Sequence, residues 1–142
     1  MVVDGREELG CDGVCLHLLD AARDSILLQV VSSGYIAGRT TEHMSLTECP
    51  AVRTSIFDGE VIAVDDALSD PRVARRAIDR FKIRACVYAP IKFDGRGEGI
   101  VIASYRTARA WTPEQVDRVA ALGRRCAAFL GTRDHDATKY SG

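Results

Sequence analysis

Five cysteines are the residues of this chain best suited to chemistry, and their number and spacing limit what they can do. The count is odd, and no later pair of Cys or His residues follows the first two at metal-ligand spacing, so a zinc site is disfavoured. Free, mostly buried thiols in a reducing compartment are the favoured interpretation. The five positions are Cys11, Cys15, Cys49, Cys86 and Cys126.

Other polar residues favour structural roles over catalysis. Asp65 and Asp66 follow a predicted strand and could bind a metal or a ligand hydroxyl, but paired aspartates there more often form turns and helix caps. His17 lies inside a predicted strand, where a lone histidine is more often a satisfied or half-exposed side chain than a ligand. The chain has no glycine loop of phosphate-binding spacing and no Ser-His-Asp set.

Length and composition indicate one soluble globular domain. The chain has 142 residues, 46% of them hydrophobic and 27% charged, and its net charge is −1. The basic segment 72–84 is interrupted by aspartate and has no interleaved aromatic platform, so we expect no nucleic-acid partner. No run approaches the ~18 apolar residues of a membrane span. The first residues lack the pattern of a secretion signal, so we expect a cytoplasmic protein and no membrane partner.

A hairpin is the element that must position most of these residues. Residues 85–93 and 99–105 are apolar and rich in β-branched and aromatic side chains, which is typical of central strands. Asp94-Gly95 between them predicts a tight turn, because glycine accepts the positive φ that such a turn needs. Pro90 cannot donate to a strand ladder, so we expect it at a bulge or where the first strand leaves the sheet.

The other elements are predicted from hydrophobic periodicity and capping residues. A helix at about 72–81 should begin at Ser69 or Asp70 as N-cap, with Pro71 at its first position. Before it we expect a strand at 11–20, a strand at 25–33 that completes a hairpin, a long connection at 34–48 with a short helical turn, a helix at 51–57 opened by Pro50, and a strand at 60–65.

The last helix carries the clearest signals. Thr112, Pro113 and Gln115 form an N-cap, a first-turn proline and a reciprocal cap. The apolar stripe that follows, as far as Leu130, consists largely of small residues. The predicted division of the chain is an N-terminal extension at 1–10, one domain at 11–130 and a disordered tail at 131–142.

This order of elements indicates an α+β domain with an antiparallel sheet of about five to six strands. Three stretches carry a further signal, DGEVIAVDD with SDPR (58–72), FKIRACVYAPIKFDGRGEGIVIA (81–103) and RAWTPEQVDRVAALGRRCAAFL (109–130). In combination they resemble the GAF family, the small-molecule sensor domains of signalling proteins. The match covers most of residues 11–130, and its last third is most similar to the branch that includes the bilin-binding photoreceptor domains.

The resemblance implies that one face of the sheet packs on the terminal helix and that the other holds a small molecule under a helix. Strand alternation places Arg84, Cys86 and Tyr88 on one face, and on the other a small apolar set suited to close packing on the last helix. The first set could line a pocket for a polar or anionic ligand, with Ile78 and Phe81 as its lid. The predicted ligand-binding residues are Asp66, Ile78, Phe81, Arg84, Cys86 and Tyr88.

In bilin-binding relatives a Cys-His pair on that helix attaches the chromophore through a thioether. Val73 and Ala74 take those places here and have neither a nucleophile nor a ring nitrogen, so covalent bilin at that site is not expected. Cys49 lies near the place where some relatives carry a second reactive cysteine. Its position beside Pro50 at a helix start could lower its pKa, although a structural role is favoured.

A second branch of the family reduces free methionine-R-sulfoxide with cysteines. Cys49-Pro50-Ala51 is only faintly similar to the first motif of those enzymes, their second motif is missing, and Cys86 lies inside a predicted strand rather than ahead of it. The resemblance therefore favours a non-catalytic sensor or regulatory module of bacterial signal-transduction type. A thiol reductase and a degenerate protein-interaction domain are the alternatives.

Relatives usually begin with a long helix that pairs with the terminal one, whereas ten residues precede the first predicted strand here. A helix without that neighbour would leave its stripe of small residues, including Gly123, uncovered. The sequence therefore predicts a homodimer through the C-terminal helix.

Overall fold

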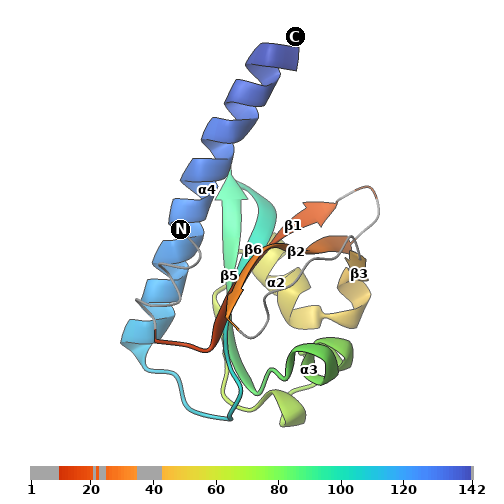
Figure 1. Ribbon diagram of the computed structural model, residues 1–142, viewed down its shortest axis with the longest axis vertical. Helices are drawn as coiled ribbons and strands as arrows, with labels where there is room; N and C mark the ends of the chain where they lie inside the picture. The colour runs from red at the N-terminus through yellow and green to blue at the C-terminus, as the bar shows by residue number, and fades with distance from the viewer. Residues whose placement is uncertain (1–9, 21, 23–24, 35–42, 142) are drawn as a thin grey trace.

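The computed structural model describes residues 10–20, 22, 25–34 and 43–141. Its centre is a six-stranded antiparallel sheet with the order β3-β2-β1-β6-β5-β4. One long helix, α4, lies against one face of this sheet, and α2 and α3 lie against the other (Figure 1). The predicted α+β class and sheet size are therefore confirmed. The strands are β1 (Gly13–Asp20), β2 (Ser25–Gly34), β3 (His43–Ser45), β4 (Ile62–Val64), β5 (Ala85–Phe93) and β6 (Arg96–Tyr105).

The β5–β6 hairpin forms at the predicted place. Asp94 and Gly95 both have positive φ, 55° and 78°, as a tight right-twisted turn requires. Pro90 lies inside the ladder opposite Ile100, and the bulge follows it, between Ile91 and Lys92. The proline is tolerated there because β4 begins at Ile62, opposite Tyr88, so the part of β5 after Tyr88 lies at the edge of the sheet.

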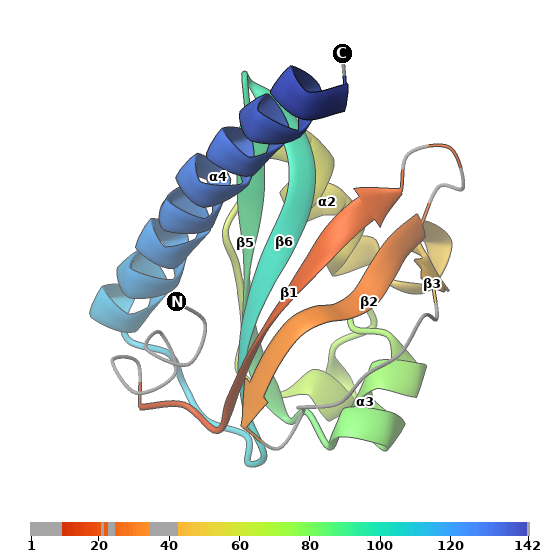
Figure 2. The ribbon, with the colours of Figure 1, turned by 45° about the horizontal axis from the view of Figure 1, so that its top comes forward.

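The β1–β2 hairpin is also confirmed, and β1 lies between β2 and β6 (Figure 2). The connection predicted at 34–48 was wrong in part, because residues 43–45 pair with residues 25–27 as strand β3. The short helical turn expected in that connection is the 3₁₀ helix η2 (Leu46–Glu48), closed by a reciprocal Ser45–Glu48 cap. The rest of the predicted connection, residues 35–42, lies outside the described residues.

Helix α2 (Pro50–Asp58) begins at the predicted proline and ends at Gly59, whose φ of 72° gives the left-handed C-cap. The predicted start of the next helix was wrong. Helix α3 (Arg75–Phe81) begins three residues later than expected, because Ala74 is extended with ψ 125° and interrupts any helix through it. Asp70 instead caps a turn, and its carboxylate accepts from the backbone N–H of Arg72 at 2.9 Å.

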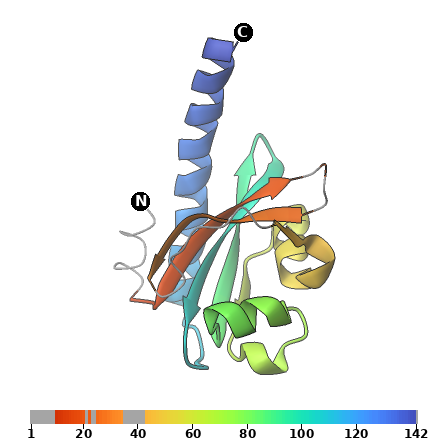
Figure 3. The ribbon, with the colours of Figure 1, turned by 45° about the vertical axis from the view of Figure 1, so that its right-hand side comes forward.

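Helix α4 (Pro113–Ser141) carries the predicted cap. The Gln115 N–H donates to the Thr112 hydroxyl at 3.1 Å, and the Thr112 N–H donates to the Gln115 side chain at 3.0 Å. The helix continues through Ser141, where the sequence pattern predicted a disordered tail from residue 131. Its C-terminal half extends beyond the sheet (Figure 3). In the described part of the chain, no helix is long and apolar enough to cross a membrane.

Two hydrophobic cores result, one on each face of the sheet. On the α4 face, mainly small and aliphatic side chains of β1, β5 and β6, together with Tyr105, pack on Val119, Leu122 and Cys126. The lid face is covered by α2, α3 and the 3₁₀ helix η3 (Ala67–Ser69). Gly123 lies so close to β5 that a Cβ there would stand 2.8 Å from the Pro90 carbonyl oxygen. Gly123, at the middle of the stripe of small residues, is thus covered by β5 of its own sheet, which weakens the reason for which the homodimer was predicted.

Candidate ligand-binding site

Strand β5 divides its side chains between the two faces as the sequence predicted. Cys86 and Tyr88 expose 0% and 2% of their surface and lie in the core of the lid face. The alternate residues lie in the α4-face core, so the strand carries polar groups on one face and a purely apolar surface on the other. Those alternate residues are Ala85, Val87, Ala89 and Ile91.

Helix α3 contributes side chains to the core on this side of the sheet. Ile78 is 2% exposed within the lid-face core, and Phe81 packs against the same core from the end of the helix. Lys82 follows with a positive φ of 58° and turns the chain towards β5. Four of the predicted site residues therefore belong to, or pack against, the same lid-face core, namely Ile78, Phe81, Cys86 and Tyr88.

Arg84 lies at the rim of this group. Its guanidinium donates to the carbonyl of Ile83 at 2.9 Å and to that of Ile78 at 3.5 Å, so part of its donor capacity joins α3 to the start of β5. Asp66 lies outside the group. Its exposed carboxylate accepts from the Leu68 N–H at 3.2 Å and caps η3, which is the turn-forming role that paired aspartates most often have.

Further thiols lie in the same core as the predicted site, and their common position was not predicted from the sequence. Cys15 and Cys49 belong to the same lid-face core as Cys86 and Tyr88. The Cys15 sulfur lies 3.1 Å from Nε2 of His17, which is itself buried. The missing information was the strand order, since β1 reaches this face only because it pairs with β6. We call Cys15, His17, Cys49, Cys86 and Tyr88 the polar cluster.

Burial determines the protonation of this cluster. It raises the pKa of the Cys86 thiol to about 12, against a smaller lowering by the Tyr88 hydroxyl. Burial likewise raises the pKa of Cys15 and of Tyr88. The pKa of Cys49 is raised by the same cause, so the lowered value that its place at a helix start could have given does not occur. At neutral pH the thiols of Cys15, Cys49 and Cys86 and the hydroxyl of Tyr88 are therefore protonated, and none of the three thiols is a thiolate.

A charged fork stands beside the cluster and was also missed from the sequence. Arg72 donates through Nε to Oδ1 of Asp70 at 3.0 Å and through Nη2 to Oδ2 at 2.7 Å. These bonds lower the pKa of Asp70 below its ordinary value. Both charges act on the Cys86 thiol, which places the fork next to the polar cluster. The signal available in the sequence was the SDPR segment (69–72), whose Ser69, Asp70 and Pro71 also fit the start of a helix.

The lid face is linked to α4 around the end of the sheet. The Trp111 indole donates to the Val64 carbonyl at 3.0 Å, and its backbone N–H donates to the Asp65 carboxylate at 3.3 Å. The Arg109 N–H donates to the Asp65 carbonyl at 3.0 Å. Asp65 thus holds the segment before α4 against the exit of β4. In the described ranges no three His, Cys, Asp or Glu side chains gather as metal ligands.

The fold and this face define a small α+β domain with buried polar groups under a short helix. A family model of the GAF domain matches residues 1–130, and the chain therefore belongs to the GAF family. GAF domains as a class are sensor and signalling modules. A search of curated proteins finds no significant sequence match.

Solved structures support the fold. The GAF domain of a phosphoenolpyruvate-protein phosphotransferase from Coxiella burnetii has a TM-score of 0.80 at 18% identity, over 96% of this chain and 82% of that one. The blue-light absorbing form of the Thermosynechococcus elongatus PixJ GAF domain has a TM-score of 0.76 at 19% identity, over 99% and 86%. Free methionine-R-sulfoxide reductase from Neisseria meningitidis has a TM-score of 0.74 at 16% identity, over 94% and 78%.

Proposed function

We propose that this chain is a non-catalytic sensor module of bacterial, cytoplasmic signal transduction, and that it binds a small polar or anionic molecule between β5 and α3. The observation that carries the proposal is the polar cluster, because three thiols, a hydroxyl and an imidazole are buried on the lid face, whereas the α4 face buries Cys11, Tyr105 and Cys126 among aliphatic side chains. The groups of the cluster bond one another, as Cys15 and His17 do at 3.1 Å, so they are satisfied in the closed state. A ligand with matching groups can exchange its own hydrogen bonds for these.

In this proposal Cys86 and Tyr88 form the floor of the site, and Ile78 and Phe81 form the lid. Arg84 at the rim supplies positive charge for a carboxylate or phosphate. In this proposal Asp66 does not contact the ligand. It caps η3, and the backbone N–H of Ala67 at the start of η3 donates to the Arg84 carbonyl at 2.7 Å. The Asp70–Arg72 fork beside the cluster adds a second guanidinium that a ligand anion can recruit.

The lid is suited to opening. Helix α3 has seven residues and no side-chain hydrogen bond at its N-cap. A helix this short is marginal without tertiary contacts, so local opening costs less than global unfolding. A ligand that moves α3 and η3 would then act on β4 and Asp65, and through Trp111 on the first turn of α4. This chain of contacts is the proposed route of the signal.

A thiol reductase is the second candidate, since the lid face gathers three cysteines and one similar structure is a methionine-R-sulfoxide reductase. A reductase needs a thiolate, and the raised pKa values of Cys49 and Cys86 oppose its formation. We expect no sulfoxide-dependent oxidation of reduced thioredoxin. Turnover that disappears in Cys86→Ser would replace the sensor proposal by this one.

A homodimer remains part of the proposal, but a different part of α4 is proposed as its interface. The stripe around Gly123 is covered by β5, so a second copy would have to contact the part of α4 that extends beyond the sheet (Figure 1). Light scattering on the full chain is expected to give twice the monomer mass of 15.5 kDa. A monomer mass would leave the alternative of an interaction domain for a different partner.

The ligand is identified first and the site is tested second. Absorbance and native mass of freshly purified protein report a bound chromophore or nucleotide, and a thermal-shift screen of metabolites follows. Tyr88→Phe removes the hydroxyl of the cluster and should weaken the ligand found by about tenfold, the value of one hydrogen bond. Tyr105→Phe is the matched control, because Tyr105 lies in the α4-face core. Equal affinities for Tyr88→Phe and the wild type would refute the site.

A further inference from the structure

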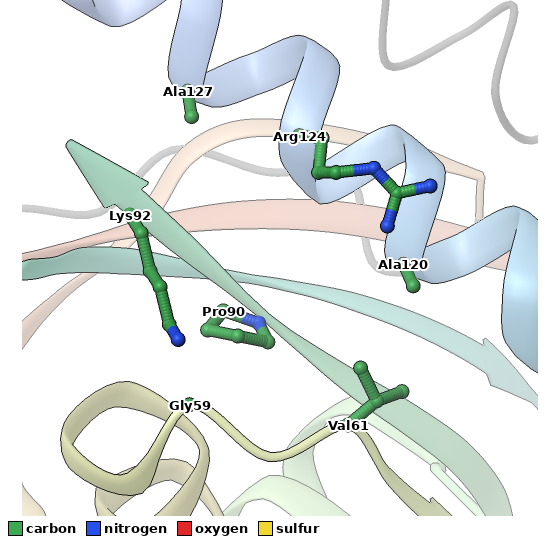
Figure 4. Close-up of a pocket in the computed structure, with 7 residues that line it drawn as sticks. All are labelled: Gly59, Val61, Pro90, Lys92, Ala120, Arg124 and Ala127. Carbon is green, nitrogen blue, oxygen red and sulfur yellow. The ribbon is translucent and has the colours of Figure 1, made fainter. Parts of the chain in front are cut away.

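A separate cavity of about 230 Å³ opens at the edge of the sheet, between β5 and α4 (Figure 4). Strand β4 begins at Ile62, opposite Tyr88, so the part of β5 after Tyr88 has no strand partner on this side, and α4 passes alongside it. No residue of the polar cluster lines this cavity. Its lining residues are Gly59, Val61, Pro90, Lys92, Ala120, Arg124 and Ala127.

The walls combine apolar surface with two positive charges. Val61, Pro90 and the two alanines of α4 present carbon, while Lys92 comes from β5 and Arg124 from α4 (Figure 4). Within the described ranges, neither cation makes a hydrogen bond or an ion pair. No acidic residue lines the cavity, since the exposed acids Asp58 and Glu60 beside Gly59 are not part of the wall. Two cations that face one hollow attract an anion.

The shape of the wall depends on a glycine. Gly59 ends α2 in the left-handed conformation, and a side chain there would overlap the ammonium end of Lys92. Because Gly59 has no side chain, the end of the Lys92 side chain can lie against its backbone along this wall. The ammonium also lies by the C-terminus of α2, where a cation interacts favourably with the helix dipole. The helix dipole can hold the Lys92 ammonium in position, but it provides no compensating negative charge for the Arg124 guanidinium.

The size of the cavity selects the class of ligand. An apolar cavity of about 150 Å³ is enough for a benzene-sized molecule, so 230 Å³ holds such a ring and one small charged group. An extended peptide fits less well, because Pro90 has no N–H and interrupts the donors that an added strand would use. We propose that this cavity binds a small organic carboxylate with an aromatic or compact apolar body, with its carboxylate between Lys92 and Arg124.

The proposal is tested by titrating the ¹⁵N-labelled full chain with benzoate and following the backbone amides. We expect shifts at Val61, Lys92, Ala120 and Ala127, and none at Tyr88 on the lid face. Benzyl alcohol, which lacks the charge, and acetate, which lacks the ring, should each bind at least fivefold more weakly. Equal binding of benzoate and benzyl alcohol, shifts centred elsewhere, or no shift at millimolar benzoate would each overturn the proposal.

Variants assign the two parts of the site. Arg124→Gln and Lys92→Gln should each weaken benzoate about two- to fivefold, as expected for exposed ion pairs. Arg118→Gln is the matched control, because Arg118 is an exposed arginine of α4 that pairs with Glu114 and does not line the cavity. Ala120→Leu fills the hollow and should abolish binding with both charges intact. Should it unfold, the glutamine variants still decide, since an unchanged affinity in both refutes the assignment.

Discussion

The two faces of one sheet differ in what they bury. The α4 face is filled mainly by aliphatic side chains, and its helix approaches so closely that only glycine fits at position 123. The lid face buries a hydroxyl, three thiols and an imidazole under a helix of seven residues. The first arrangement maximises packing, and the second keeps polar groups under a cover that is weakly held. From this difference we infer that packing against α4 provides most of the stability of the domain and that the lid face is the part that responds to a ligand.

The largest effect is expected on the α4 face. Leu122→Ala removes a side chain that is 1% exposed and packed against the sheet. The free energy of unfolding should fall by about 2–5 kcal/mol, because the rigid strands behind it cannot collapse into the space. Urea denaturation followed by circular dichroism measures this change. A loss below about 1 kcal/mol would mean that α4 is not the stabilising element.

A smaller and local effect is expected from the same kind of change in the lid. Ile78→Ala should loosen α3 and raise the rate at which native Cys86 reacts with a thiol reagent by about tenfold, which is ~1.4 kcal/mol of opening free energy. In the closed state the pKa of Cys86 is about 12, so the reaction at pH 8 must pass through an opened state. Cys126 on the α4 face is the internal control, and equal acceleration of both thiols would indicate global unfolding instead.

The connection between the faces should contribute less than either core. Trp111→Phe keeps an aromatic ring beside Tyr105, whose centroid lies 4.9 Å away, but removes the bond from the indole to the Val64 carbonyl. We expect a loss of about 0.5–1.5 kcal/mol, the usual contribution of one hydrogen bond. Urea denaturation measures this change in the free energy of unfolding. If the signal passes this way, the variant should also reduce the response of α4 amides to a lid-face ligand without changing its affinity.

Local signals in the sequence were sufficient for much of this architecture. The turn at Asp94-Gly95, the cap at Thr112 and the alternation along β5 are decided by neighbouring residues, and each was predicted correctly. The start of α3 was predicted wrongly, because proline is equally compatible with a first helical turn and with the turn that Asp70 caps here.

The candidate site was only partly accessible from sequence for a different reason. Cys86 and Tyr88 share a strand, so their common face follows from alternation. Cys15 and Cys49 join them through strand order and helix packing, which no local pattern encodes. The edge cavity was invisible for the same reason, because Lys92 and Arg124 meet only after α4 has docked on β5.

The smallest effect concerns the charged fork beside the lid face. Asp70→Asn keeps an oxygen for the Arg72 N–H but removes the charge that the guanidinium holds. Because Arg72 is 48% exposed, the loss at pH 7 should not exceed about 1 kcal/mol. The sign with pH is fixed by the lowered pKa of Asp70, whose ordinary value is 3.8. The pair stabilises the fold above that value, and its contribution is lost as pH falls through the lowered folded value. Denaturation curves of wild type and variant should therefore differ at pH 7 and converge towards pH 2, and a gap that widens on acidification would contradict the assigned role of the fork.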